Sequence, residues 1–227
     1  MKQIHAQDRD GISAGDLSPY PWLEVVNPTA RVGKVRYALF DFDGTISVIR
    51  RGWEEIMIPL MVEMICDRTP ATSEIEAEVA EYVDRSTGIL TIKQMRWLEE
   101  AVRRHGLASS VKTAHEYKHI YNERLLQPVR ERMKQLDGSE AARDNLMIAG
   151  ARSFLRGLHH CGVALYLASG TDQVYVEEEA QALGVIQLFG SRIYGARDDT
   201  EAYTKAEVKL DQAARAALSG DQLIVVG

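Results

Sequence analysis

The segment from Val35 to Thr45, VRYALFDFDGT, constrains the fold of this chain more than any other. Five of its first six residues suit a buried strand, and the strand then ends in two aspartates, Asp41 and Asp43, with a glycine directly after them. In open α/β sheets the ligand site lies beyond the carboxyl ends of the strands. We therefore expect a buried strand that delivers two carboxylates to a functional edge of a sheet.

The aspartate pair predicts metal and phosphate chemistry rather than a simple turn. Side chains at i and i+2 of an extended segment share a side, so Asp41 and Asp43 repel each other unless a cation lies near them. Mg²⁺ suits such a site, because it takes carboxylate and carbonyl oxygens and usually a substrate phosphate as well. Gly44 lets the backbone turn close to a ligand, and Thr45 adds a hydroxyl. Two merely solvated acids are the alternative, which the preceding apolar strand disfavours.

Further strands and helices alternate along the second half of the chain. Residues 162–169 (GVALYLAS) and 221–227 (DQLIVVG) read as buried strands, and residues 186–195 are a weaker strand candidate. Helical patterns cover residues 172–184 and 204–220, each ending in glycine. This order predicts a doubly wound α/β domain with a parallel sheet.

A helical segment interrupts this pattern after the first strand. Residues 51–143 contain apolar positions at helical spacing and no convincing strand. Ser73 followed by Glu76 is a capping-box pattern that predicts a helix start at Ser73, and a later long helix is expected to break near Pro128. We therefore expect residues 34–50 and 144–227 to form the α/β core, with residues 51–143 inserted as an all-helical domain. Residues 1–33 form a polar extension that either packs on the surface or is disordered.

Three motifs in this order resemble the haloacid dehalogenase superfamily of Mg²⁺-dependent phosphotransferases. They are LFDFDGT, then LYLASGTD at the end of the second strand, then EAYTKAEV. The resemblance implies that Asp41 is the nucleophile and Asp43 the general acid/base, and that Asp41 and the backbone carbonyl of Asp43 also bind the metal. It also implies that Ser169 and Gly170 bind the phosphate and that Lys205 neutralises it. Lys209, one helical turn later, competes for the role of Lys205.

The helical insertion is similar to the cap of the phosphoglycolate phosphatase and β-phosphoglucomutase-like branch. Such a cap would close over the site and read the substrate. Arg50, Arg51 and Trp53 lie at the expected hinge. Arg50 is a candidate for binding a second anionic group of the substrate, and a solvated hinge is the alternative. The loop with Thr87 and Gly88 is a further candidate to face the core.

The resemblance implies hydrolysis of a small phosphomonoester, of the sugar phosphate or phosphoglycolate type, through an aspartyl-phosphate. A sugar-phosphate mutase of the same fold and a non-catalytic regulatory module are the alternatives. The fourth motif of the family places an acid after a strand such as DQLIVVG, where this sequence stops. The expectation is therefore a chain truncated before that acid, with Mg²⁺ binding weakened accordingly.

Composition excludes several other classes. A net charge of −6 argues against a nucleic-acid-binding protein, and no apolar run is long enough for a signal peptide or a membrane span. Hydrophobic residues make up 45% of the chain, enough for a packed core. Two distant cysteines indicate neither a disulfide framework nor a zinc site, so we expect a cytoplasmic protein whose partner is a small phosphorylated substrate.

Overall fold

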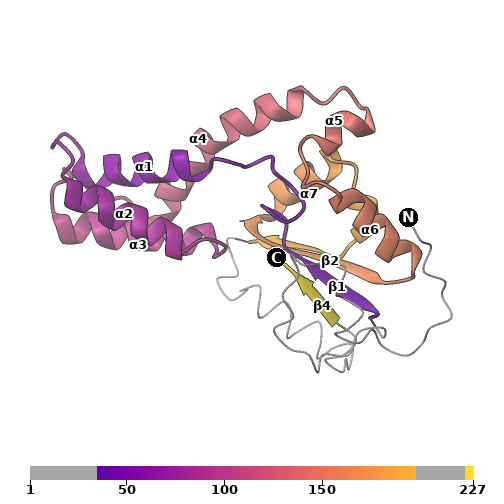
Figure 1. Ribbon diagram of the computed structural model, residues 1–227. Helices are drawn as coiled ribbons and strands as arrows, with labels where there is room; N and C mark the ends of the chain where they lie inside the picture. Colours follow the sequence, from indigo (N-terminus) through magenta and orange to yellow (C-terminus); the bar gives the residue numbers. More distant parts are fainter. Residues whose placement is uncertain (1–34, 198–222) are drawn as a thin grey trace, which may run out of the picture.

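The strand that carries the aspartate pair lies inside a parallel sheet (Figure 1). The computed structural model describes residues 35–197 and 223–227. Within these ranges the strands are β1 (Tyr37–Phe40), β2 (Ala164–Asp172), β3 (Ile193–Ala196) and β4 (Leu223–Val226). Their order is β3-β2-β1-β4, and every pair is parallel. The expected α/β class with a parallel sheet is confirmed.

The sequence pattern predicted β1, β2 and β4 directly and β3 only in part. Residues 186–195, expected as one weak strand, divide into the short helix α8 (Ile186–Phe189) and strand β3. The prediction was wrong for the first half because Ile186 and Phe189 have helical i, i+3 spacing and both pack against the core. The helix expected over residues 204–220 lies outside the described residues.

Alternate strand residues separate onto the two faces of the sheet, as the period of two requires. One face packs against α6 (Ala151–His160), α7 (Gln173–Ala182) and α8, and Phe40 contacts the rings of Phe154 and Phe189 there. The other face carries a smaller cluster around Leu39 and Ala168. The apolar core of the α/β part therefore lies between the sheet and these three helices.

Four helices form a separate group beside the sheet, called here the helical insertion (Figure 1). They are α1 (Glu54–Cys66), α2 (Ser73–Arg85), α3 (Thr91–His105) and α4 (Ala114–Lys134). Their packing is maintained by buried apolar residues on every helix, and the rings of Tyr82 and Trp97 stack at 3.9 Å between α2 and α3. A short helix, α5 (Glu140–Asp144), follows α4 on the way back to the core.

Two local expectations for the insertion need correction. Thr72, rather than Ser73, is the N-cap of α2, since the Thr72 hydroxyl accepts a hydrogen bond from the Ile75 amide. Helix α4 continues through Pro128 instead of breaking there. Its N-terminus is held by a capping box between Thr113 and Glu116.

The two segments that join the insertion to the core run side by side. The Val48 amide donates to the Leu146 carbonyl and the Ile148 amide to the Ile46 carbonyl, both at 3.0 Å. Arg132, near the end of α4, donates to the Ile49 carbonyl. The entry and exit of the insertion are therefore fixed to each other next to β1.

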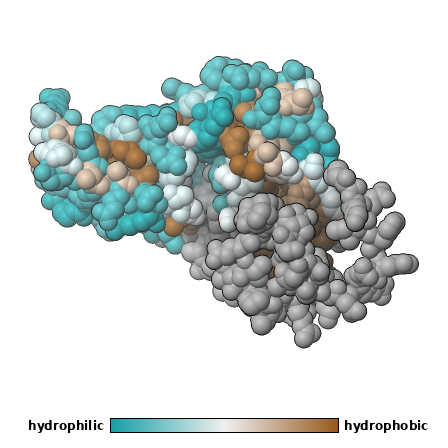
Figure 2. All heavy atoms as spheres, viewed as in Figure 1, coloured by the Kyte–Doolittle hydropathy of each residue, from teal (hydrophilic) through white to brown (hydrophobic). Residues whose placement is uncertain are grey.

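The surface of the described residues is mostly hydrophilic in the view of Figure 2, with smaller hydrophobic areas between helices. Among residues 35–197 and 223–227, no helix has both the length and the apolar character needed to cross a membrane.

Replacing Phe189 by alanine should destabilise the core strongly. Phe189 is fully buried against Phe40, and removing a buried phenyl group costs about 3–5 kcal/mol of unfolding free energy. Phe154→Ala is the matched control, because Phe154 touches the same ring but is 49% exposed. Urea denaturation should show the larger loss for Phe189→Ala, and equal losses would contradict this account of the core.

Candidate active site

Asp41 and Asp43 lie directly beyond the end of β1, where the backbone leaves the sheet. The Asp41 amide still donates to the Val226 carbonyl of β4 at 2.9 Å, which anchors this residue to the sheet. Phe42 between the two acids is fully buried. Gly44 then adopts a φ of 79°, which favours glycine, and the chain turns so that the Ile46 and Ser47 amides donate to the Phe42 carbonyl.

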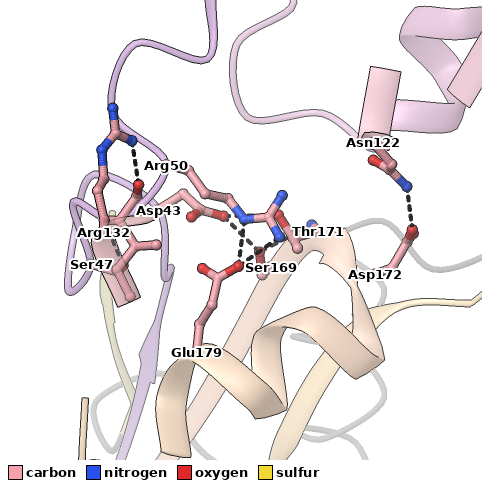
Figure 3. A network of polar contacts seen from close by, with 10 residues as sticks. Asp43, Ser47, Arg50, Asn122, Arg132, Ser169, Thr171, Asp172 and Glu179 are labelled. Carbon is pink, nitrogen blue, oxygen red and sulfur yellow. Dashed lines mark hydrogen bonds and ion pairs between the residues drawn. The ribbon is translucent and has the colours of Figure 1, made fainter. Parts of the chain in front are cut away.

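The carboxyl group of Asp43 is held by two hydroxyl groups from the end of β2 (Figure 3). Ser169 and Thr171 donate to the same oxygen, Oδ2, at 3.2 and 3.0 Å. The Thr171 amide in turn donates to the Ser169 hydroxyl at 3.1 Å, which orients it. Oδ1 of Asp43 is buried and has no hydrogen-bond partner among the described residues.

Burial raises the pKa of the Asp43 carboxyl above its ordinary value of 3.8, and the charge of Arg50 and the Thr171 hydrogen bond oppose this rise. A carboxyl group with a raised pKa retains its proton more readily, so it is better suited to donate a proton to a leaving oxygen. Asp43 therefore has the environment of a general acid/base.

Arg50 forms a buried ion pair with Glu179 of α7. Its Nε and Nη2 atoms both donate to Oε1 of Glu179, at 2.9 and 2.6 Å, and its guanidinium lies 5.6 Å from the centre of the Tyr175 ring. Figure 3 shows the guanidinium group next to Asp43, Ser169 and Thr171. Arg50 is only 7% exposed, so the solvated-hinge alternative is wrong for Arg50, whereas its neighbour Arg51 is exposed.

A cavity of about 130 Å³ lies between the strand ends and the helical insertion. The core and the segment that leads from β1 into the insertion, called here the crossing segment, contribute Asp41, Asp43, Arg50, Trp53, Ser169, Gly170 and Thr171. The insertion contributes Thr87, Gly88, Ile89, Thr91, Gln94, Tyr121 and Leu125. The candidate loop with Thr87 and Gly88 therefore does face the core.

The end of β2 and the loop between α2 and α3 approach each other very closely at Gly170. A Cβ atom at this position would lie 2.8 Å from the Ile89 carbonyl oxygen. Only glycine fits there without displacing the loop. The contact places the helical insertion directly over the carboxyl end of β2.

The remaining candidates fall at the edge of the cavity or outside the described residues. Thr45 is not among the residues that line the cavity; its hydroxyl lies 4.0 Å from where a Cβ atom of Gly227 would be, and that Cβ would lie 3.1 Å from the Cβ of Asp41. Lys205 and its competitor Lys209 lie outside the described residues. Their predicted role stays a prediction.

The sequence reasoning missed Thr171 and Glu179. Thr171 stands two residues after Ser169 in an extended segment, so the two hydroxyls could have been expected on one side. Glu179 lies three residues after the buried Val176 and next to the buried Ala180, which places an acid on the apolar face of a helix. A buried acid requires a charged partner, and that signal was available.

The acid pair fits a hard divalent cation in ligand type. Carboxylate and carbonyl oxygens are preferred Mg²⁺ ligands, so the Asp41 carboxylate and the Asp43 backbone carbonyl would be the ligands from this pair. Within residues 35–197 and 223–227, no group of three or more His, Cys, Asp or Glu side chains could hold a metal ion. Asp41 and Asp43 would therefore supply only part of the ligand set of such an ion.

Glu179 should make the stability of the fold depend on pH. Burial raises its pKa from an ordinary 4.5 to about 7, against the attraction of Arg50 and with smaller repulsions from Asp43 and Glu178. The folded chain then binds a proton that the unfolded chain has released, so this contribution is complete below pH 4.5 and lost as pH rises through 7. Between pH 5 and 8, the unfolding free energy of the native chain should fall relative to Glu179→Gln by up to about 3 kcal/mol.

Urea denaturation across this pH range checks the prediction. The control is Glu178→Gln, which changes the exposed neighbouring acid and should keep the pH slope of the native chain. Parallel slopes for the native chain and Glu179→Gln would show that Glu179 does not titrate as its burial implies.

Comparisons with known proteins bear on this site. A family model for haloacid dehalogenase-like hydrolases matches residues 35–227. A search of curated proteins found no match. Among solved structures, a β-phosphoglucomutase from Clostridium difficile is 14% identical with a TM-score of 0.52, covering 84% of this chain and 75% of that one.

Two further structures are similar to the same degree. A predicted phosphatase from Clostridium acetobutylicum is 15% identical, with a TM-score of 0.51 and coverage of 84% and 74%. A predicted phosphoglycolate phosphatase from Haemophilus somnus is 14% identical, with a TM-score of 0.51 and coverage of 85% and 76%. At these identities the likeness shows the fold. The family model extends from β1 and its two aspartates to the end of β4, and this protein therefore belongs to the haloacid dehalogenase-like hydrolases.

Proposed function

We propose that this chain is a phosphatase that hydrolyses a small phosphomonoester, of the sugar phosphate or phosphoglycolate type, with the help of Mg²⁺. The observation that carries the proposal is the pairing of two acids in one cavity: Asp41 at the strand end and Asp43 enclosed by the hydroxyls of Ser169 and Thr171. Membership of the hydrolase family supports it.

The residues divide the reaction between them. A carboxylate oxygen of Asp41 attacks phosphorus, and the bond from phosphorus to the leaving oxygen breaks, so that an aspartyl-phosphate forms. Asp43 gives its proton to the leaving alcohol and then takes a proton from the water that hydrolyses the intermediate. The burial that raises the pKa of Asp43 favours the first of these steps.

The phosphoryl group would lie between the two acids and the end of β2. The Ser169 hydroxyl and the backbone of Gly170 would hold its oxygens, with Thr45 near Asp41 and Lys205 proposed as the neutralising cation. Mg²⁺, held in part by Asp41 and Asp43, would offset the negative charge that phosphate brings to two carboxylates.

We also propose that the helical insertion is the cap of this enzyme. Its loop between α2 and α3 lies over Gly170 and lines the cavity together with the acids. A cap in this position would exclude water from the aspartyl-phosphate until the leaving alcohol has departed. The hydrogen-bonded crossing segments at residues 46–48 and 146–148 would act as its attachment.

Replacing Asp41 by asparagine should abolish Mg²⁺-dependent phosphate release. The amide is a poor nucleophile, so turnover should fall at least about 10³-fold. The measurement is release of inorganic phosphate from p-nitrophenyl phosphate and from small sugar phosphates, with mass spectrometry to detect phosphorylated Asp41 in the native chain. Asp84→Asn makes the same change on the exposed surface of α2 and should have native turnover. Retained turnover in Asp41→Asn would sink the mechanism.

Gly170→Ala should impair the same activity without unfolding the protein. The added methyl would force the Ile89 carbonyl and its loop away from the end of β2, which disturbs the phosphate site and the closed cap. We expect a loss of roughly tenfold or more in kcat/KM, as for other small misplacements of reacting groups.

Gly157→Ala is the matched control for this variant. Gly157 is exposed within α6 and has no atom within 4 Å of an added Cβ. Its activity should be native, and its stability should rise by about 0.5–1 kcal/mol because alanine favours a helix. Native kinetics in Gly170→Ala would show that the close approach at Ile89 is not needed for turnover.

A further inference from the structure

The ion pair between Arg50 and Glu179 lies at the cavity, but it is not required by the chemistry proposed for Asp41 and Asp43. Arg50 comes from the segment that leads into the helical insertion, and Glu179 comes from α7 of the core. The side chains are 8% and 2% exposed, so the pair is withdrawn from bulk water. Its charges are therefore screened far less than those of a surface pair.

Arg50 is the only lysine or arginine that lines the cavity within the described residues. Among the described residues that line the cavity, the guanidinium group of Arg50 is therefore the one positively charged group beside the leaving group. Glu179 holds that group through two hydrogen bonds to one oxygen and cancels its charge. At pH 8, above the pKa of about 7 for Glu179, the pair has no net charge.

The guanidinium group nevertheless keeps hydrogen-bond donors for a ligand. Glu179 accepts from Nε and Nη2, and among the described residues no other side chain or carbonyl accepts a hydrogen bond from Arg50. Arginine has five N–H groups and Arg50 lines the cavity, so N–H groups beyond the two bonded to Glu179 remain for a ligand. A ligand would therefore accept hydrogen bonds from a guanidinium group whose charge is balanced by Glu179.

The opposite wall of the cavity is also uncharged. The insertion contributes Thr87, Thr91, Gln94 and Tyr121, which carry hydroxyl or amide groups. The volume of about 130 Å³ is well below the roughly 300–1,000 Å³ of sites for drug-sized ligands. The cavity, which also has to hold the phosphoryl group, therefore matches the phosphate ester of a small alcohol with hydroxyl groups.

We propose that Arg50 and Glu179 together form a charge-neutral donor site that selects esters of small uncharged polyols over esters whose alcohol carries a carboxylate or a second phosphate. This inference rests on the proposed phosphatase function and narrows its substrate class. It also revises the expected role of Arg50, which would bind hydroxyl groups rather than a second anion. A carboxylate or second phosphate on the alcohol would find no net opposite charge at this pair. The site would discriminate against such an ester for that reason.

A series of charge variants tests this proposal with two matched substrates. Glycerol 3-phosphate and 3-phosphoglycerate differ mainly in that a CH₂OH group replaces a carboxylate. Their kcat/KM ratio is measured at pH 8 for the native chain, for Glu179→Gln, for Arg50→Gln and for the double variant. An ester that is not turned over is measured instead by its inhibition constant against p-nitrophenyl phosphate.

The ratio should follow the net charge of the pair. The native chain should prefer glycerol 3-phosphate, and Glu179→Gln, which exposes the charge of Arg50, should shift the ratio toward 3-phosphoglycerate by roughly tenfold, mostly in KM. Arg50→Gln should shift it little, because loss of the attraction of Arg50 raises the pKa of Glu179 further and keeps that buried carboxyl protonated and uncharged. The double variant should return it toward the native value, a rescue that general structural damage would not produce.

Two controls separate the possible failures. Glu178→Gln, on the exposed side of α7, should keep the native ratio, and circular dichroism should confirm that each variant is folded. If p-nitrophenyl phosphate is hydrolysed and the ratio is the same across the series, the selection by Arg50 and Glu179 is wrong while the phosphatase function stands. If the native chain hydrolyses no phosphomonoester with Mg²⁺ present, the proposed function fails and this inference fails with it.

Discussion

The enclosed carboxyl group of Asp43 is the constraint to which the rest of the site responds. A carboxylate withdrawn from water is costly unless hydrogen bonds or opposite charge compensate for it. Here the compensation comes from separate parts of the chain: hydroxyls at the end of β2 and the guanidinium group of Arg50 from the crossing segment. Glu179 of α7 then fixes Arg50 in place. One acid at a strand end therefore ties together the sheet, a core helix and the segment leading to the insertion.

The sequence predicted the parts of this arrangement that follow from local pattern. An apolar run followed by D-x-D-G locates β1 and both acids, and a second apolar run ending in Ser169 locates β2 beside it. Parallel strands then bring Asp43 and Ser169 together, although they are 126 residues apart. The strand-end site therefore needed no knowledge of side-chain packing, whereas the order of the strands in the sheet came from the structure.

The pairing of Arg50 with Glu179 was beyond such reasoning, although the position of Glu179 on the apolar face of α7 could be read from the sequence. Arg50 and Glu179 are separated by 129 residues, and their contact depends on how the crossing segment and α7 pack, which no periodicity encodes. The same reason explains why the sequence left Arg50 open as a ligand for an anion or as a solvated hinge residue. The sequence pattern also placed the N-cap of α2 at Ser73 instead of Thr72, because both residues offer a hydroxyl.

The antiparallel contacts between residues 46–48 and 146–148 have a consequence for how this architecture tolerates change. The insertion leaves and re-enters the core through two segments that are hydrogen-bonded to each other. The two ends of the insertion are therefore held together next to the core. The register of β1 with β2 and β4 does not depend on what the intervening helices are. Helices α1 to α4 can therefore be lengthened, shortened or exchanged over evolutionary time while the two aspartates keep their place, and such changes would alter the wall of the candidate site that faces them.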